Sequence, residues 1–116
     1  MRFMVLMIPG VYRGNKKLDN FAPPPEAMEK MGKFNDQLVK AGILKDGTGL
    51  QPLSQGARIS FASGKPTVTD GPFVEAKEVL GGFWMMDVKS KEEAIEWMKK
   101  CPAEKDDLLE IREVFG

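Results

Sequence analysis

Apolar residues follow two kinds of pattern along the chain, and each pattern predicts its own kind of element. Short, nearly continuous or alternating apolar segments, bounded by Gly, Pro, Ser or Asp, are typical of strands. Five segments fit that description: residues 2–8, 57–62, 67–69, 83–88 and 108–115. The second and third are joined by a turn and predict a hairpin. In the last segment Leu109, Ile111 and Phe115 are expected on one face, with Glu110 and Arg112 on the other.

Two other segments carry apolar residues at steps of three and four, which predicts helices. The first covers residues 26–41, with three prolines before it and Gly42 after it. Its methionines, Met28 and Met31, are interpreted as part of the core, because methionine commonly fills gaps between packed elements. The second helix runs to about Lys100 from Ser90 and Glu93, which form a capping box. Residues 43–56 lack periodicity and predict a loop or a short strand.

The order of these elements is strand, helix, hairpin, strand, helix, strand. It predicts the α+β class: a ferredoxin-like antiparallel sheet with both helices on one face. Residues 3–8 and 83–86 do not alternate, although one face of such a sheet is left to solvent. Because large exposed apolar patches are rare in monomers, the second face is expected to pack on another copy, giving a homodimer that forms an α+β barrel.

Composition narrows the class of protein. A chain of 116 residues predicts one domain over residues 1–116. Seventeen basic and seventeen acidic residues cancel, which argues against nucleic acid as a partner. The sequence contains neither a polybasic cluster nor a long apolar run, so contact with a membrane is not predicted. Cys101, the single cysteine, is interpreted as a small buried apolar residue, and the absence of a disulfide favours the cytoplasm.

The richest candidate chemistry lies around Asp70. An Asp-Gly pair predicts a turn, but the amide two residues on belongs to Pro72, which has no N–H to donate. Two roles for the Asp70 carboxylate are therefore open: a local structural one, or ligand binding and catalysis. The segment after it is either extended or a short helix. In the functional interpretation Asp70 is the catalytic base of a polar cleft whose ligand-binding residues are Tyr12, Arg58, Glu75 and Lys77.

Several of these segments together resemble the YCII-related family, in its DGPF subgroup. The resemblance is carried by residues 69–73, 75–78, the Gly81-Gly82 pair, residues 93–97, Cys101-Pro102 and residues 109–114. It implies a ferredoxin-like fold that dimerises as an α+β barrel. Some relatives in the wider superfamily use a His–Asp pair, but this chain contains no histidine, so that pair is not carried over.

Two functions are compatible with these residues. The first is a homodimer that binds a small molecule in the polar cleft and acts as an enzyme if Asp70 is buried. The second is a non-catalytic regulatory or interaction protein, which the resemblance links to sigma-factor signalling. With no histidine, one cysteine and no calcium-loop spacing, neither a metal site nor a cofactor is predicted.

Overall fold

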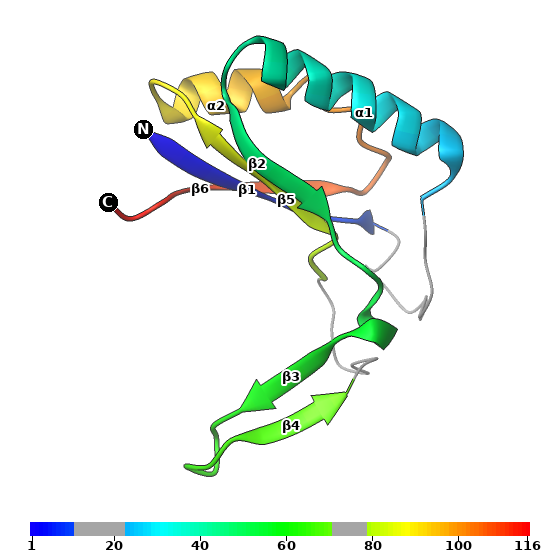
Figure 1. The fold of residues 1–116 in the computed structure, drawn as a ribbon, viewed down its shortest axis with the longest axis vertical. Coiled ribbons are helices and arrows are strands. Elements are labelled where there is room, and N and C mark those ends of the chain that lie inside the picture. Colours follow the sequence, from blue (N-terminus) through cyan, green and yellow to red (C-terminus); the bar gives the residue numbers. More distant parts are fainter. Residues whose placement is uncertain (11–22, 71–78) are drawn as a thin grey trace.

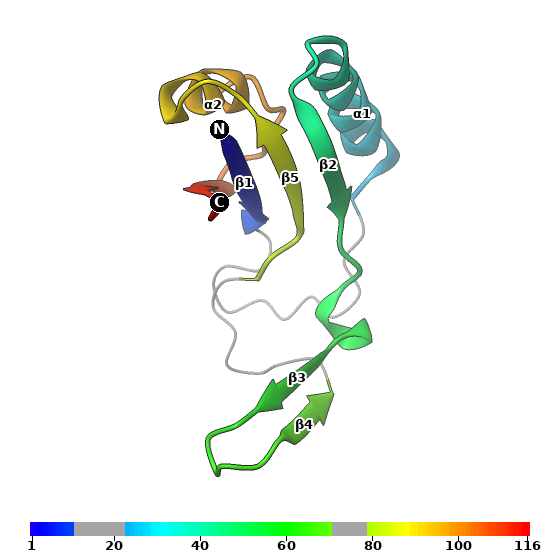
Figure 2. The same ribbon diagram turned by 60° about the vertical axis from the view of Figure 1, so that its left-hand side comes forward.

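The computed structural model describes residues 1–10, 23–70 and 79–116, and its main feature is an antiparallel four-stranded sheet (Figure 1). The strands lie in the order β2-β5-β1-β6, and their bounds are β1 Arg2–Ile8, β2 Leu44–Gly49, β5 Gly82–Asp87 and β6 Leu108–Glu113. Helices α1 Pro25–Lys40 and α2 Lys91–Met98 both lie over one face (Figure 2). The predicted α+β, ferredoxin-like arrangement is thus confirmed.

The core lies between that face and the two helices. Cross-strand pairs on β1 and β5 supply the sheet side: Phe3 lies opposite Met86, and Val5 lies opposite Trp84. All four side chains are buried. The helices supply Phe34 and Leu38 from α1 and Ala94 and Met98 from α2. Alternation along the strands therefore places one set of apolar residues under the helices, as the period of two requires.

Both helices begin where the sequence predicts. Pro25 occupies the first turn of α1, where the missing N–H costs no hydrogen bond. Ser90 caps α2, and its side chain accepts a hydrogen bond from the Glu93 amide at 3.1 Å. Among the described residues, no helix is both long enough and apolar enough to cross a membrane.

The predicted hairpin exists, but it does not belong to the main sheet. Strands β3 Ala57–Ser60 and β4 Thr67–Asp70 form a separate two-stranded sheet that extends away from the helices (Figure 1). The fourth strand of the main sheet is β2, from the segment expected to be a loop or short strand. The glycines of β2 give no apolar pattern from which a strand could be predicted. A Cβ on Gly47 would lie 3.0 Å from the Phe83 carbonyl oxygen, so pairing with β5 favours glycine there.

The prediction for Phe115 is wrong. β6 ends at Glu113, two residues earlier, and the Phe115 side chain is completely exposed at 105% of its reference area. Leu109 and Ile111 do pack against the core, as expected.

The face of the sheet away from the helices is apolar at its centre. We call Met4, Leu6, Phe83 and Met85 the open-face residues. They form cross-strand pairs, Met4 with Met85 and Leu6 with Phe83, and each is only partly buried. Within the described part of the chain, no helix covers this face. The sequence expectation of two-sided apolar strands is confirmed, whereas the dimer that it implies stays a prediction.

Candidate functional site

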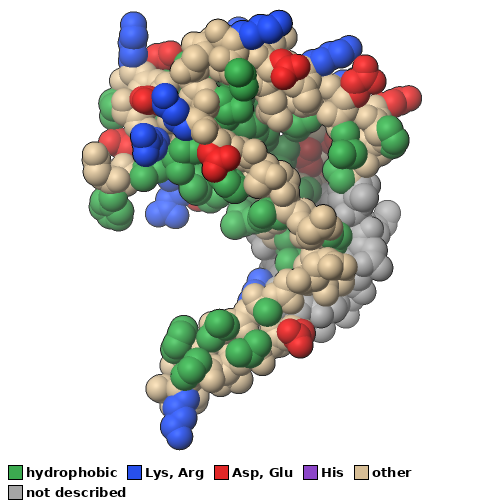
Figure 3. All heavy atoms as spheres, in the orientation of Figure 1, with side chains coloured by type: hydrophobic (Ala, Val, Ile, Leu, Met, Phe, Trp, Pro, Cys, Tyr) green, Lys and Arg blue, Asp and Glu red, His purple; other side chains and the backbone are tan. Residues whose placement is uncertain are grey.

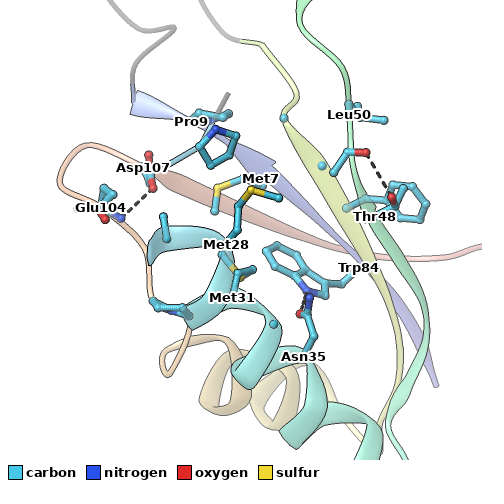
Figure 4. A pocket seen from close by; sticks show the side chains of 18 of the residues that line it. Met7, Pro9, Met28, Met31, Asn35, Thr48, Leu50, Trp84, Glu104 and Asp107 are labelled. Atoms are coloured by element: carbon cyan, nitrogen blue, oxygen red, sulfur yellow. Dashed lines mark hydrogen bonds between the residues drawn. The ribbon is translucent and has the colours of Figure 1, made fainter. Parts of the chain in front are cut away.

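A cavity of about 590 Å³ opens between α1, the ends of three strands and the loop after α2. Its walls are largely apolar: Met7 and Pro9 from the end of β1, Met28 and Met31 from α1, and Trp84 from β5 (Figure 4). Gly32, which has no side chain, and Asn35, which is polar, lie on the same face of α1 as Met28 and Met31. Residues at i, i+3, i+4 and i+7 of a helix share one face. The cavity is therefore an apolar hollow with few polar groups.

Trp84 is held in one orientation. Its indole Nε1–H donates to Asn35 Oδ1 at 2.8 Å, and its ring meets Phe34 edge-on with centroids 6.4 Å apart. Because an indole N–H can only donate, the carbonyl end of the Asn35 amide must face it. The amide nitrogen of Asn35 is a donor on the other branch of the same amide.

Two adjacent glycines let three strand ends converge beside the cavity. A Cβ on Gly81 would collide with the Pro9 ring, and one on Gly82 would lie 2.8 Å from the Thr48 carbonyl oxygen. The Gly81 amide donates to Met7 O at 2.8 Å, and its carbonyl accepts from Leu50 N at 2.9 Å. The absence of side chains at these two positions therefore allows the close approach of these segments beside the cavity.

Asp107 fastens the loop after α2 to the end of β1. Its Oδ1 accepts from the Gly10 amide at 2.7 Å, and its Oδ2 accepts from the Glu104 amide at 2.8 Å. Both carboxylate oxygens are thus bonded to backbone amides. Asp107 consequently shapes this end of the cavity.

Cys101 lies behind the α1 wall, with its Sγ 4.0 Å from Met31 Sδ. Burial, and secondarily the negative charge of Asp107, raise the pKa of the Cys101 thiol to about 11. A thiol in such surroundings stays protonated at neutral pH and is inert. This agrees with its interpretation as a small apolar residue. Nowhere in residues 1–10, 23–70 and 79–116 do three His, Cys, Asp or Glu side chains gather as a metal site.

Two of the residues predicted for a polar cleft, Asp70 and Arg58, are not among the described residues that line this cavity. Asp70 and Arg58 are both exposed on the hairpin. Asp70 pairs with Ala57, and Arg58 pairs with Thr69, so the two side chains point to opposite faces of the hairpin. Tyr12, Glu75 and Lys77 lie outside the described residues. The roles assigned to these five residues stay predictions.

Sequence reasoning missed the cavity because it assigned the α1 methionines to the core. Met31 is half-buried and packs against the core, as expected, whereas Met28 is exposed; both also line the cavity. Two signals were present in the sequence. Gly32 interrupts an otherwise good helix at a cost of about 1 kcal/mol relative to alanine. Asn35 places an amide within the apolar stripe.

Comparison with known proteins agrees with this architecture. The family described as YCII-related domain matches residues 1–116, the entire chain. The chain is also 33% identical over 72 residues to the uncharacterized protein R00369 of Rhizobium meliloti (strain 1021). That alignment covers 62% of this chain and 58% of the relative, less than two thirds of the relative's length. On the match over its full length, the chain belongs to the YCII-related domain family.

Proposed function

We propose that this protein binds a small, largely apolar molecule in the cavity between α1 and the sheet, and that it acts as a homodimer. The cavity is the observation that carries the binding proposal. Its volume of about 590 Å³ falls within the range of small-molecule sites, about 300 to 1,000 Å³. Such sites combine apolar walls with a few placed polar groups, and Met31, Trp84 and Asn35 supply that combination here.

The polar groups narrow the chemistry of the ligand. The Asn35 amide nitrogen is a donor beside Trp84, so it favours a ligand that carries a carbonyl, hydroxyl or carboxylate oxygen. Lys105 and Glu104, which are both exposed, line the same cavity and add one positive and one negative charge near solvent. The proposed ligand is therefore an apolar molecule with one oxygen-bearing polar end.

Gly32 provides a direct test of binding. A Cβ added at Gly32 would meet no atom within 4 Å, so the space beside it accepts a side chain. We expect Gly32→Leu to fill part of the cavity and to weaken binding of the apolar dye 8-anilinonaphthalene-1-sulfonate at least about tenfold, about 1.4 kcal/mol. Fluorescence titration measures this effect.

Gly32→Ala is the matched control, because it makes the same gain in helix propensity but adds a single methyl group. It should bind the dye much as the wild type does. Equal affinity of the Leu and Ala variants for the dye would contradict a site beside Gly32.

The open-face residues support the homodimer. They leave an apolar centre on a surface that no described helix covers. One row of cross-strand neighbours on this face runs Asp46, Met85, Met4, Arg112, from the β2 edge to the β6 edge. A two-fold axis parallel to the strands would set Asp46 of one copy opposite the partner's Arg112. The face is thus apolar at its centre and complementary in charge to itself.

A charge placed at the centre of that face tests the dimer. Met85→Lys would bury an unpaired ammonium group between two copies, so we expect a monomer at concentrations where the wild type sediments as a dimer. Gln37→Lys, on the exposed surface of α1, adds the same charge elsewhere and should leave the dimer intact. A wild-type chain that sediments as a monomer throughout the micromolar range would refute the homodimer.

We also propose the finer assignment to the DGPF subgroup of the family. Residues 69–73, with the sequence Thr-Asp-Gly-Pro-Phe, support it. The assignment does not change the binding proposal, because the cavity does not use Asp70.

A further inference from the structure

The β3–β4 hairpin is the most exposed part of the described chain. Every residue from 55 to 70 is exposed. An isolated two-stranded hairpin is marginally stable in water at best, because it has no packed face. This hairpin lies outside the main sheet and gains little from the core. A surface packed against its exposed side chains would therefore stabilise it.

One face of the hairpin is apolar beyond its base, where Ala57 and Asp70 pair on the same side. Ile59 and Val68 form a cross-strand pair, and Phe61 follows two residues after Ile59 on the same side. Their exposed fractions are 58%, 64% and 68% respectively. The opposite face carries Arg58 and Thr69 as one pair and Ser60 and Thr67 as another. We call Ile59, Phe61 and Val68 the hairpin stripe.

The hairpin stripe is as large as the surface patches that are often functional. Side chains of this size at these exposures present on the order of 300 Å² of apolar surface, which is already the range in which surface patches are often functional. It also meets a second apolar surface across a hollow. Hydrophobic side chains gather along the hairpin and along the side of the main sheet away from the helices, and the molecule is hollowed between them (Figure 3).

We infer that the hairpin is an arm that packs its Ile59, Phe61 and Val68 stripe onto a second copy of this chain. The inference rests on the proposed homodimer. A body seated on the open-face residues enters the hollow beside the hairpin, so the stripe continues the same interface. Standard interfaces bury about 800 Å² per partner, and the arm adds a substantial part of that area. The chain carries no net charge, so two copies meet without overall repulsion.

Two-fold symmetry determines which surface each arm packs against. In a closed dimer each copy presents the same patch, so each arm reaches the other copy and both stripes are covered together. The arms would then hold the dimer around its edge while the open-face residues hold it at the centre. This arrangement also removes two exposed β-ribbons whose apolar faces favour aggregation.

A photo-crosslinker at position 61 tests the arm directly. Phe61→p-benzoylphenylalanine keeps an aromatic side chain on the stripe. After irradiation, the dimer of this variant should run as a covalent dimer on a denaturing gel. The same residue at Thr67, on the polar face, is the control and should give little covalent dimer. Covalent dimer from position 67 but not from position 61 would overturn the arm.

The dimer dissociation constant gives an independent measurement. Replacing the stripe with Ile59→Ser, Phe61→Ser and Val68→Ser should raise Kd at least about tenfold in sedimentation experiments, because clustered apolar contacts carry much of an interface's affinity. The control triple Ser60→Ala, Thr67→Ser and Thr69→Ser should leave Kd unchanged. Near-ultraviolet circular dichroism of Trp84 and Trp97 shows whether both triples keep the folded core.

The outcomes separate the arm from the dimer on which it rests. A wild-type chain that is monomeric throughout overturns both. A wild-type dimer with an unchanged Kd in the stripe triple and no covalent product from position 61 overturns the arm alone.

Discussion

The Cys101 thiol shows how the surroundings of one residue decide its chemistry. Two lysines, Lys99 and Lys100, precede it in sequence, and neighbouring positive charge ordinarily favours a thiolate. Burial beside Met31 and the carboxylate of Asp107 act in the opposite direction and raise the pKa of the thiol to about 11. The interpretation of Cys101 as a small buried apolar residue agrees with these surroundings.

The raised pKa predicts slow reaction with thiol reagents. The thiolate is the reactive form, and at pH 8 its population should be about 100-fold smaller than for a thiol with the ordinary pKa of 9.0. Reaction with 5,5′-dithiobis(2-nitrobenzoate) at pH 8 should be slower in the folded protein by about that factor than in the urea-unfolded chain. The folded rate should climb as the pH approaches 11. Equal folded and unfolded rates at pH 8 would show that Cys101 is not protected.

At the scale of elements, the glycine pair decides how closely β1, β2 and β5 approach one another beside the cavity. Gly82 pairs with Gly49 of β2 and with Met7 of β1. Its missing side chain leaves room for the Thr48 carbonyl, 2.8 Å from where a Cβ would lie. Because that obstacle is backbone, it cannot move aside without shifting the strand.

Gly82→Ala should therefore destabilise the protein by about 1 to 3 kcal/mol, the usual cost of overpacking. Gly32→Ala provides the contrast, because it adds a methyl group to open space in a helix and should stabilise the protein by roughly 0.5 to 1 kcal/mol. Urea unfolding of both variants measures the difference. A stabilised Gly82→Ala variant would contradict the tight approach of β2 to β5.

Sequence patterns predict elements well where burial leaves a periodic signal. β1, β5 and α1 bury regular sets of apolar residues, and each was predicted within a residue or two of its bounds. β2 leaves no such signal, because Gly47 pairs with β5 by having no side chain rather than by burying an apolar one. The hairpin was predicted from its local alternation, but membership of a sheet depends on distant partners. Local patterns do not contain that information.

The candidate site illustrates the same limit. The charged motif around Asp70 attracted the functional interpretation because its residues are adjacent in sequence. The cavity instead draws Met7, Met31, Trp84 and Asp107 from four separate segments. Only the fold brings them together, so no single stretch of sequence could reveal the site. Gly32 and Asn35, both in α1, were the two signs of the cavity that the sequence contained.

At the scale of the whole molecule, two surfaces with different proposed roles lie on opposite sides of the sheet, and Phe83 borders both. The cavity lies on the helix side of the sheet, where α1 and the loop after α2 enclose it (Figure 4). The open-face residues and the hairpin stripe lie on surfaces that no described helix covers. Ligand binding and dimer formation can therefore be altered one at a time, by Gly32→Leu and by Met85→Lys.

The binding of an apolar molecule in the cavity is the central claim, and the two tryptophans test it within one sample. Trp84 lines the cavity, whereas Trp97 lies on α2 with the Lys100 ammonium 4.8 Å from its ring centroid. Each gives one indole N–H signal in a ¹H–¹⁵N spectrum, and Trp84→Phe identifies which is which. Titration with 8-anilinonaphthalene-1-sulfonate should shift the Trp84 signal saturably and leave the Trp97 signal in place. A shift of the Trp97 signal alone, or an unchanged Trp84 signal at saturating dye, would contradict the proposed site.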